Sequence, residues 1–174
     1  MPPIVPTAFD AQQAARGEHA DAPAIQDAYP NGFAHCFGCG RLNLEGHHLK
    51  SHLVGDETVA RFTAPAKYTG GVPGKAYGGL VASLLDCHGT ASAAAFAAYA
   101  AGTAIGGDVP LARYVTASLK VDFKQPTPLE KELTLRARLR SIDGRKAWVD
   151  LSLSAGDVVC ATGEMLAMRI ADIA

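Results

Sequence analysis

The chain has 174 residues and a mass of 18.1 kDa, which predicts one domain and leaves no room for two catalytic domains. Lys and Arg total 16 against 17 Asp and Glu, so a formal charge of −1 favours neither a nucleic acid nor a membrane surface as partner. A composition that is 48% hydrophobic and 19% charged excludes a chain disordered throughout, and its unusual feature is 32 Ala and 18 Gly beside one Trp.

Residues 1–32 are expected to form a loosely ordered arm. They are rich in Ala, Pro and small polar residues, and only the stretch from Phe9 to Arg16 has a helical composition. The segment from Met1 to Asp10 lacks the basic and apolar regions of a signal peptide, and the four cysteines are too scattered for a secreted disulfide scaffold. We therefore expect a cytoplasmic protein whose single domain covers residues 33–174.

The domain is predicted to begin with a hairpin and a glycine-rich loop. Two strand-like runs, Leu49 to Val54 and Thr58 to Thr63, flank a turn signal at Gly55-Asp56. The loop from residue 66 to 79 contains five Gly and leads directly into an apolar run.

That apolar run, residues 80–101, is long enough to cross a bilayer. It contains Asp86 and His88, however, and nine of its residues are Ala, which supply little transfer free energy. We therefore predict a buried helix of a soluble protein, from about Gly79 to Ala101.

Four more strands are expected after a loop at residues 102–110. The first two alternate apolar and polar residues with a period of two, as in half-buried strands, and tight-turn signals separate the last three. The last strand is long enough to carry a bulge near Gly163. The four runs are residues 115–124, 133–140, 147–153 and 158–170.

Two strands, one long helix and four strands joined by tight turns are typical of an α+β fold. The expected arrangement is an antiparallel sheet with the helix on one face. Small side chains would let a strongly curved sheet close around this helix, which accounts for the many Ala residues without reference to function.

Asp86 is out of place on such a helix. Its neighbours Leu80, Leu84 and Leu85 are apolar, so a carboxylate among them loses hydration unless water, donors or a substrate meet it. Asp86 is therefore either an ordinary residue at the solvated edge of the helix or a carboxylate held at a cleft.

The string PGKAYGGLVASLLD, from Pro73 to Asp86, resembles the motif of the PaaI-like acyl-CoA thioesterases of the hotdog superfamily. That motif is His-Gly-Gly at the start of the central helix, followed by an acidic residue on the helix. Tyr77 takes the place of the His, Gly78 and Gly79 match, and Asp86 falls at the acidic position. Weaker matches are the strand from Thr116 to Leu129, the hairpin Gly144-Arg145-Lys146, and a Cys36-Phe37-Gly38-Cys39 leader with Asn43.

The resemblance implies a hotdog fold, with about six strands wrapped around one helix. It also implies at least a homodimer, or a dimer of dimers, in which Asp86 of one chain faces the loop around Gly79 of the other. The expected activity is hydrolysis of an acyl-CoA thioester to a carboxylic acid and free coenzyme A, without a metal or an organic cofactor.

Physical chemistry gives the matched residues plausible roles. Backbone N–H groups of Gly78 and Gly79 at a helix N-terminus can polarise a thioester carbonyl and stabilise its oxyanion. Asp86 lies two turns further along, roughly 10 Å away, and can act as a general base for water or as a nucleophile. The alternative for the glycines is that they only allow close packing.

Two further residues have open interpretations. Thr116 matches a position at which some relatives hold the attacking water, but it is also an ordinary Thr on the polar face of a strand. Tyr77 departs from the family pattern, since a Tyr hydroxyl can donate a hydrogen bond but titrates near pH 10, well above a His.

Basic residues near the expected cleft are candidates for the phosphates of coenzyme A. Arg145 and Lys146 at a hairpin tip are favoured by the resemblance, while a row of Arg on one strand is more typical of a solvated face. The other candidates are Arg113, Lys120 and Lys124, and the row is Arg136, Arg138 and Arg140.

The pair Cys36 and Cys39 has part of the ligand spacing of a zinc site. His35, His47 and His48 are nearby in the sequence, but adjacent histidines would point apart in a strand. We therefore expect no metal.

Two other functions fit the same fold. A dehydratase or hydratase acting on acyl thioesters favours a His that Tyr77 does not supply, and an acyl-CoA binding module would carry a silent site.

Overall fold

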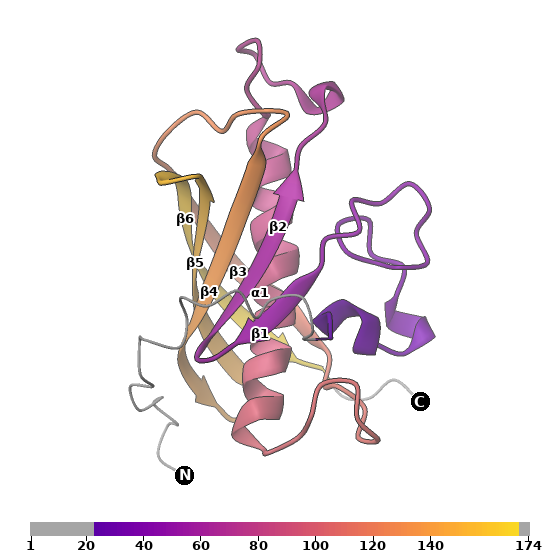
Figure 1. Cartoon of the computed structure of the whole chain (residues 1–174). Coiled ribbons are helices and arrows are strands. Elements are labelled where there is room, and N and C mark those ends of the chain that lie inside the picture. Colours follow the sequence, from indigo (N-terminus) through magenta and orange to yellow (C-terminus); the bar gives the residue numbers. More distant parts are fainter. Residues whose placement is uncertain (1–22, 171–174) are drawn as a thin grey trace.

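A sheet of six antiparallel strands curves around one long helix in the computed structural model, which describes residues 23–170 (Figure 1). The strand order is β1-β2-β4-β5-β6-β3, so β1 and β3 form the two edges. This confirms the α+β hotdog fold. The elements are β1 (Ser51–Val54), β2 (Glu57–Thr63), α1 (Gly78–Ala100), β3 (Tyr114–Phe123), β4 (Glu132–Asp143), β5 (Lys146–Ala155), β6 (Val158–Arg169) and three 3₁₀ turns, η1 (Ile25–Ala28), η2 (Asn31–Phe33) and η3 (Ala66–Tyr68).

Helix α1 fits inside the curved sheet because its side chains are small. Ala has the strongest helix propensity, and a run of Ala side chains on α1 is fully buried without thickening the helix. A Cβ at Gly89 would lie 2.6 Å from the Met165 sulfur, so a side chain there would force the buried Met165 side chain to move. Among the described residues, α1 is the one helix with the length and composition to cross a membrane, and 78% of its most apolar window is buried.

The packed part of the protein begins earlier than residue 33. Ile25, Gln26 and Tyr29 are almost completely buried, although they fall in the segment expected to be a loose arm. Residues 23–50 lie beside β1 and α1 (Figure 1). The helical stretch expected from Phe9 to Arg16 lies outside the described residues.

The last strand carries the predicted bulge, three residues before Gly163: β6 has one extra residue, Cys160, between the partners of Leu153 and Ser154 of β5. Gly163 pairs in regular register with Val121 on one side and Leu151 on the other. A further irregularity lies in β3, between Thr116 and Ser118, opposite consecutive residues of β6. A Cβ at Gly163 would lie 3.2 Å from the carbonyl oxygen of Lys120, so a glycine relieves a tight contact between β6 and β3 there.

A buried polar network joins α1 to the first hairpin. The His88 side chain is fully buried, and its Nδ1 lies 2.9 Å from the hydroxyl of Ser51, which also accepts a hydrogen bond from Gln26. Thr58 and Ser92 share a second hydroxyl contact of 2.5 Å on the other side of the ring. Burial lowers the pKa of His88 to about 3, so the imidazole is neutral in the folded protein.

This pKa makes folding stability depend on pH. The folded His88 stays neutral, while the unfolded chain takes up a proton below its ordinary value of 6.5. Stability therefore falls as the pH drops from 6.5 towards 3, by roughly 1.4 kcal/mol per pH unit from this residue.

The measurement is the free energy of unfolding between pH 6 and pH 4.5, compared between wild type and His88→Gln. We expect a shallower slope in His88→Gln, and the wild-type slope in the control His48→Gln, whose side chain is exposed. Equal slopes in all three proteins would contradict the role of His88.

Candidate active site

Asp86 and Thr116 meet between α1 and β3. The Thr116 hydroxyl donates a hydrogen bond to Oδ1 of Asp86 at 2.5 Å. Asp86 is half-buried in an otherwise buried stretch of α1, and Thr116 is exposed. The carboxylate therefore has one fixed donor while part of its surface remains open to water or substrate.

The bulge in β3 creates this contact. Thr116 pairs with the buried Ala167 and so faces the helix, whereas Lys120 pairs with Glu164 on the outer face. In a regular strand Thr116 and Lys120 would share a face, because they are four residues apart. The extra residue at position 117 turns Thr116 inward, which alternation in the sequence does not predict.

The three motif residues that precede Asp86 form the start of α1. Tyr77 is the N-cap residue, and its side chain makes no capping hydrogen bond. The N–H groups of Gly78 and Gly79, which have no intrahelical acceptor in the first turn, therefore receive no cap from Tyr77. A Cβ at Gly79 would lie 2.4 Å from the Tyr77 ring, and one at Gly78 would lie 3.2 Å from the Phe123 ring. Both glycines therefore allow close packing as well as leaving the backbone open.

A row of rings connects the leader to the start of α1. His47 packs edge-on against Phe37, Phe62 and Tyr68, and Tyr68 lies next to Tyr77 with ring centroids 6.4 Å apart. His47 Nδ1 is 3.0 Å from the Tyr68 hydroxyl. Burial, followed by the charge of Lys67, lowers the pKa of His47.

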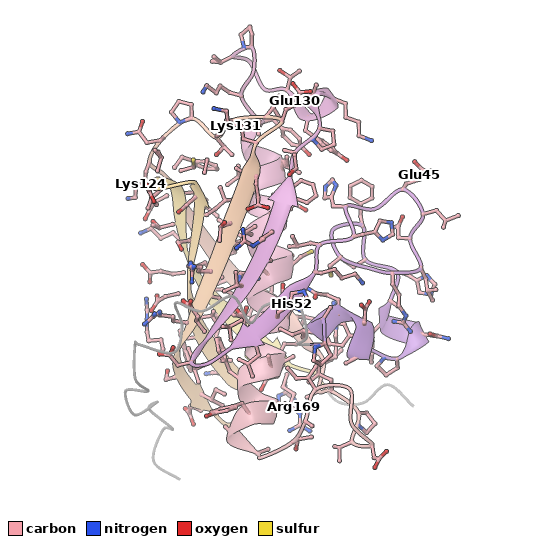
Figure 2. The ribbon with its side chains drawn as sticks, in the orientation of Figure 1. Glu45, His52, Lys124, Glu130, Lys131 and Arg169 are labelled. Atoms are coloured by element: carbon pink, nitrogen blue, oxygen red, sulfur yellow. The ribbon has the colours of Figure 1, made fainter. Side chains whose placement is uncertain are left out.

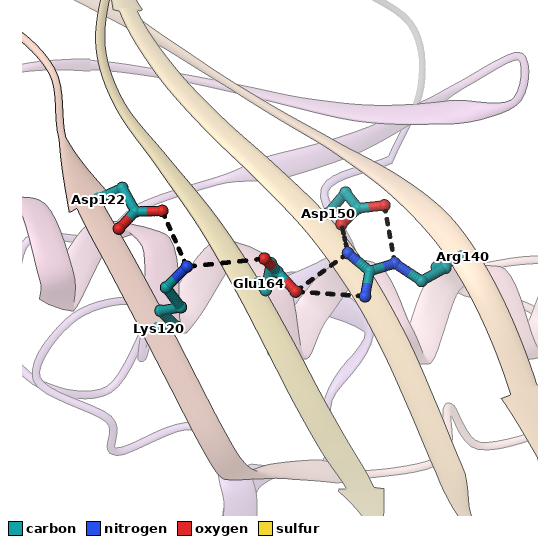
Figure 3. Close-up of polar contacts among 5 residues, drawn as sticks. All are labelled: Lys120, Asp122, Arg140, Asp150 and Glu164. Carbon is teal, nitrogen blue, oxygen red and sulfur yellow. Dashed lines mark hydrogen bonds and ion pairs between the residues drawn. The ribbon is translucent and has the colours of Figure 1, made fainter.

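The basic candidates are divided among different parts of the surface. Lys120 belongs to an ion-pair network on the outer face of the sheet, with Asp122 at 3.2 Å and Glu164 at 3.9 Å (Figure 3). The Arg row is also paired on this side: Arg136 and Arg138 contact Glu57, and Arg140 contacts Asp150 and Glu164 (Figure 3). The helix lies behind the sheet in Figure 3, so Lys120 and Arg140 lie on the face of the sheet away from α1.

Arg145 and Lys146 remain exposed at the turn between β4 and β5. Lys146 of β5 pairs with Met168 of β6, and Met168 pairs in turn with Val115 of β3. Lys146 is therefore two strands away from Val115, the residue that precedes Thr116.

Lys124 lies at the end of the molecule where the chain enters α1 (Figure 2). Arg169 lies at the far end from it.

Arg113 is half-buried and stacks on Tyr29, with its guanidinium 4.7 Å from the ring centroid. Burial raises the pKa of Tyr29 to about 12, so this hydroxyl keeps its proton. The hydrogen bond with the Cys36 thiol raises the pKa of Cys39, and the charge of Arg113 lowers it by a smaller amount. Arg113 therefore points into the leader rather than to an open rim.

One further residue, which the sequence does not single out, is brought to the leader by the fold. Cys87, the neighbour of Asp86, lies against Cys36 and Cys39, and the sulfur atoms of all three lie within 4.8 Å of one another. The only signal in the sequence was a cysteine inside an apolar helix, which is ordinarily just a small buried residue.

Solved structures identify the family. A thioesterase superfamily protein from Shewanella loihica is 38% identical, with a TM-score of 0.62, and the similarity covers 84% of this chain and 99% of that one. The chain belongs to the thioesterase superfamily. This confirms the family predicted from Tyr77-Gly78-Gly79 and Asp86, although the sequence matches no family model.

Curated relatives point the same way over a shorter region. The acyl-coenzyme A thioesterase THEM4 of Rattus norvegicus is 32% identical over 87 residues, which cover 50% of this chain. The chain spans only about a third of that relative, since the match covers 31% of its length.

Two more distant structures share the fold alone. The PaaI protein of E. coli is 17% identical with a TM-score of 0.57, and covers 72% of this chain and 81% of that one. A Streptococcus mutans protein solved bound to acetyl CoA is 16% identical with a TM-score of 0.52, and covers 66% of this chain and 82% of that one.

Proposed function

We propose that the protein hydrolyses acyl-CoA thioesters, with Asp86 as the group that activates water or attacks the thioester. The observation that carries this proposal is the hydrogen bond from Thr116 to Asp86. It fixes one carboxylate oxygen and leaves the other for a water molecule or for the substrate. Membership of the thioesterase superfamily supports the reaction class, and the match to THEM4 supports coenzyme A as the carrier.

In the general-base form of the step, Asp86 takes a proton from water while the water oxygen bonds to the thioester carbon. The tetrahedral intermediate carries its negative charge on the former carbonyl oxygen, which the N–H of Gly79 would stabilise. The carbon–sulfur bond then breaks, and coenzyme A leaves as a thiolate that takes up a proton. In the nucleophilic form, Asp86 bonds to the carbon and the carbon–sulfur bond breaks, so coenzyme A leaves as a thiolate; water then cleaves the anhydride to the carboxylic acid and restores Asp86. Neither form uses a cofactor beyond the coenzyme A of the substrate.

A second subunit would complete this site. Strand β3 is an edge, so its outer backbone groups are open to pairing, and Val115 and Phe123 on it are 38% and 57% exposed. Antiparallel pairing of two β3 strands sets the end of one beside the start of the other. Gly78 packs on Phe123 at the end of β3, and Thr116 lies near its start. The glycines of one subunit would then lie beside the partner subunit's Asp86.

The same dimer offers two exposed cations to the substrate. Arg145 and Lys146 have no ion pair within residues 23–170, whereas Lys120 and the Arg row are neutralised by carboxylates. We propose that Arg145 and Lys146 bind phosphates of coenzyme A. The Streptococcus mutans structure with acetyl CoA is consistent with a coenzyme A site on this fold.

Replacing Asp86 by Asn should abolish thioester hydrolysis. Loss of the base or nucleophile is expected to reduce kcat by at least about 100-fold, because positioned acid–base catalysis contributes on that order. The assay is release of free thiol from acyl-CoAs of short, medium, long and aromatic acyl groups.

The matched control is Asp122→Asn, which removes a carboxylate on the outer face and should keep the wild-type rate. Thermal unfolding of Asp86→Asn should stay close to wild type, so that lost activity is not lost structure. A wild-type rate in folded Asp86→Asn would refute the assignment, and tight binding of acyl-CoA without thiol release by the wild type would indicate a binding module.

Removing both Arg145 and Lys146 should weaken substrate binding without changing the chemical step. In the double variant Arg145→Ala, Lys146→Ala we expect KM for acyl-CoA to rise about tenfold at unchanged kcat, since two exposed charge contacts are lost. Acyl-pantetheine, which lacks the nucleotide phosphates, should show no difference. Lys120→Ala serves as the control, and an equal rise in KM in that variant would refute the assignment.

A further inference from the structure

Three thiols from two distant parts of the chain converge in the structure. Cys36 and Cys39 come from the leader and Cys87 from the middle of α1, and the three sulfur atoms lie within 4.8 Å of one another. The sulfur atoms of Cys36 and Cys87 are 3.6 Å apart. Four thiolates bound tetrahedrally to zinc, with bonds of about 2.3 Å, have their sulfur atoms about 3.8 Å apart. The spacing of this cluster is therefore close to that of a metal site.

The leader is shaped to bring these sulfur atoms together. A Cβ at Gly38 would lie 2.3 Å from the Cys87 sulfur, so only glycine lets the leader lie directly on α1 at this point. A Cβ at Gly40 would lie 2.4 Å from the backbone nitrogen of Cys36. The loop closes with a hydrogen bond of 2.7 Å from Gly40 N–H to the Cys36 carbonyl. Close packing thus fixes the pair Cys36 and Cys39 against the helix.

Buried polar groups next to the cluster lack partners among the described residues. The Tyr29 hydroxyl is buried, as is Nη1 of Arg113, and neither has a hydrogen-bond acceptor within residues 23–170. Cys39 and Cys87 are near enough to act electrostatically on Tyr29, and Arg113 acts on Cys39. A negatively charged cluster would give these donors a counterpart, and three thiolates around a divalent cation carry a net charge of −1.

We propose that Cys36, Cys39 and Cys87 bind a thiophilic divalent cation, zinc by preference, with a water molecule at the fourth position. Soft thiolate ligands select zinc over oxygen-preferring cations such as magnesium. Cys36 is the half-exposed member of the cluster, so the fourth position is on its solvent side. The site revises the expectation of no metal, which considered Cys36 and Cys39 with histidines; His47 instead contacts Tyr68.

A metal site explains the cluster better than a disulfide does. A disulfide joins two sulfur atoms at about 2.05 Å and leaves the third cysteine without a role. A bond between Cys36 and Cys87, whose sulfur atoms are 3.6 Å apart, would leave Cys39 outside it. The cation would tie the leader to α1 at the residue after Asp86 and stabilise the fold. It would take no part in the thioester chemistry, so this inference is independent of the proposed hydrolysis.

The first test is metal content. Protein purified without chelators under reducing conditions, and then dialysed after incubation with zinc sulfate, should hold about one zinc per chain by elemental analysis. Cys36→Ser should lose most of the zinc, and the matched control Cys160→Ser should retain it, because Cys160 lies on β6 outside the cluster. Zinc that stays bound in Cys36→Ser, or wild-type protein that holds none, would overturn the proposal.

Cobalt gives a second test that does not depend on how well the variants fold. Addition of Co²⁺ to metal-free wild-type protein should produce a thiolate-to-cobalt charge-transfer band and the visible bands of tetrahedral geometry. Zinc should also raise the thermal midpoint of the wild type by several degrees and leave that of Cys36→Ser unchanged. Absence of the cobalt bands would overturn the proposal. So would a disulfide between two of the three cysteines that persists in protein purified under reducing conditions.

Discussion

The close approach of helix α1 to the curved sheet is the constraint on which the rest of the structure depends. At Gly89 a Cβ would meet the buried Met165 side chain, and the Ala residues that follow on the helix, Ala91 and Ala93 to Ala95, are completely buried. A thicker helix would force the sheet outward, and core packing does not tolerate such an increase in volume without strain. The small residues of the sequence thus set the distance between the helix and every strand that contacts it.

Two functional features follow from that distance. Because α1 lies close to β3, a short side chain such as Thr116 can reach Asp86. Because α1 also lies close to the leader, Cys87 can reach Cys36. Both contacts use neighbouring residues on the same helix, Asp86 and Cys87. A shift of α1 relative to the sheet would therefore disturb the Asp86 carboxylate and the thiol cluster together.

The sequence predicts most of the fold, because the spacing of apolar, polar and turn-forming residues specifies the helix and most of the strands. Period-two alternation identifies β3 and β4, tight-turn signals separate β5 and β6, and the Ala-rich run identifies α1. The site is predicted less well, for physical reasons. One bulge residue in β3 reverses the face on which Thr116 lies, and alternation carries no information about it.

Contacts between distant segments are the other part that the sequence does not specify. Cys36 and Cys87 are 51 residues apart, and no local pattern relates them. Tyr29 and Ile25 likewise belong to a stretch whose composition indicates a loose arm, yet they fill the core. Ion pairing of Lys120 with Glu164 also depends on strand order, which brings β3 beside β6.

The central claim is that Thr116 and Asp86 act as one catalytic unit across the contact between α1 and β3. A double-mutant cycle on kcat/KM for acyl-CoA hydrolysis tests it most directly, with Thr116→Val, Asp86→Asn and the double variant. We predict that Thr116→Val lowers kcat/KM in the wild-type background and has almost no further effect in Asp86→Asn. Additive effects of the two substitutions would contradict the account.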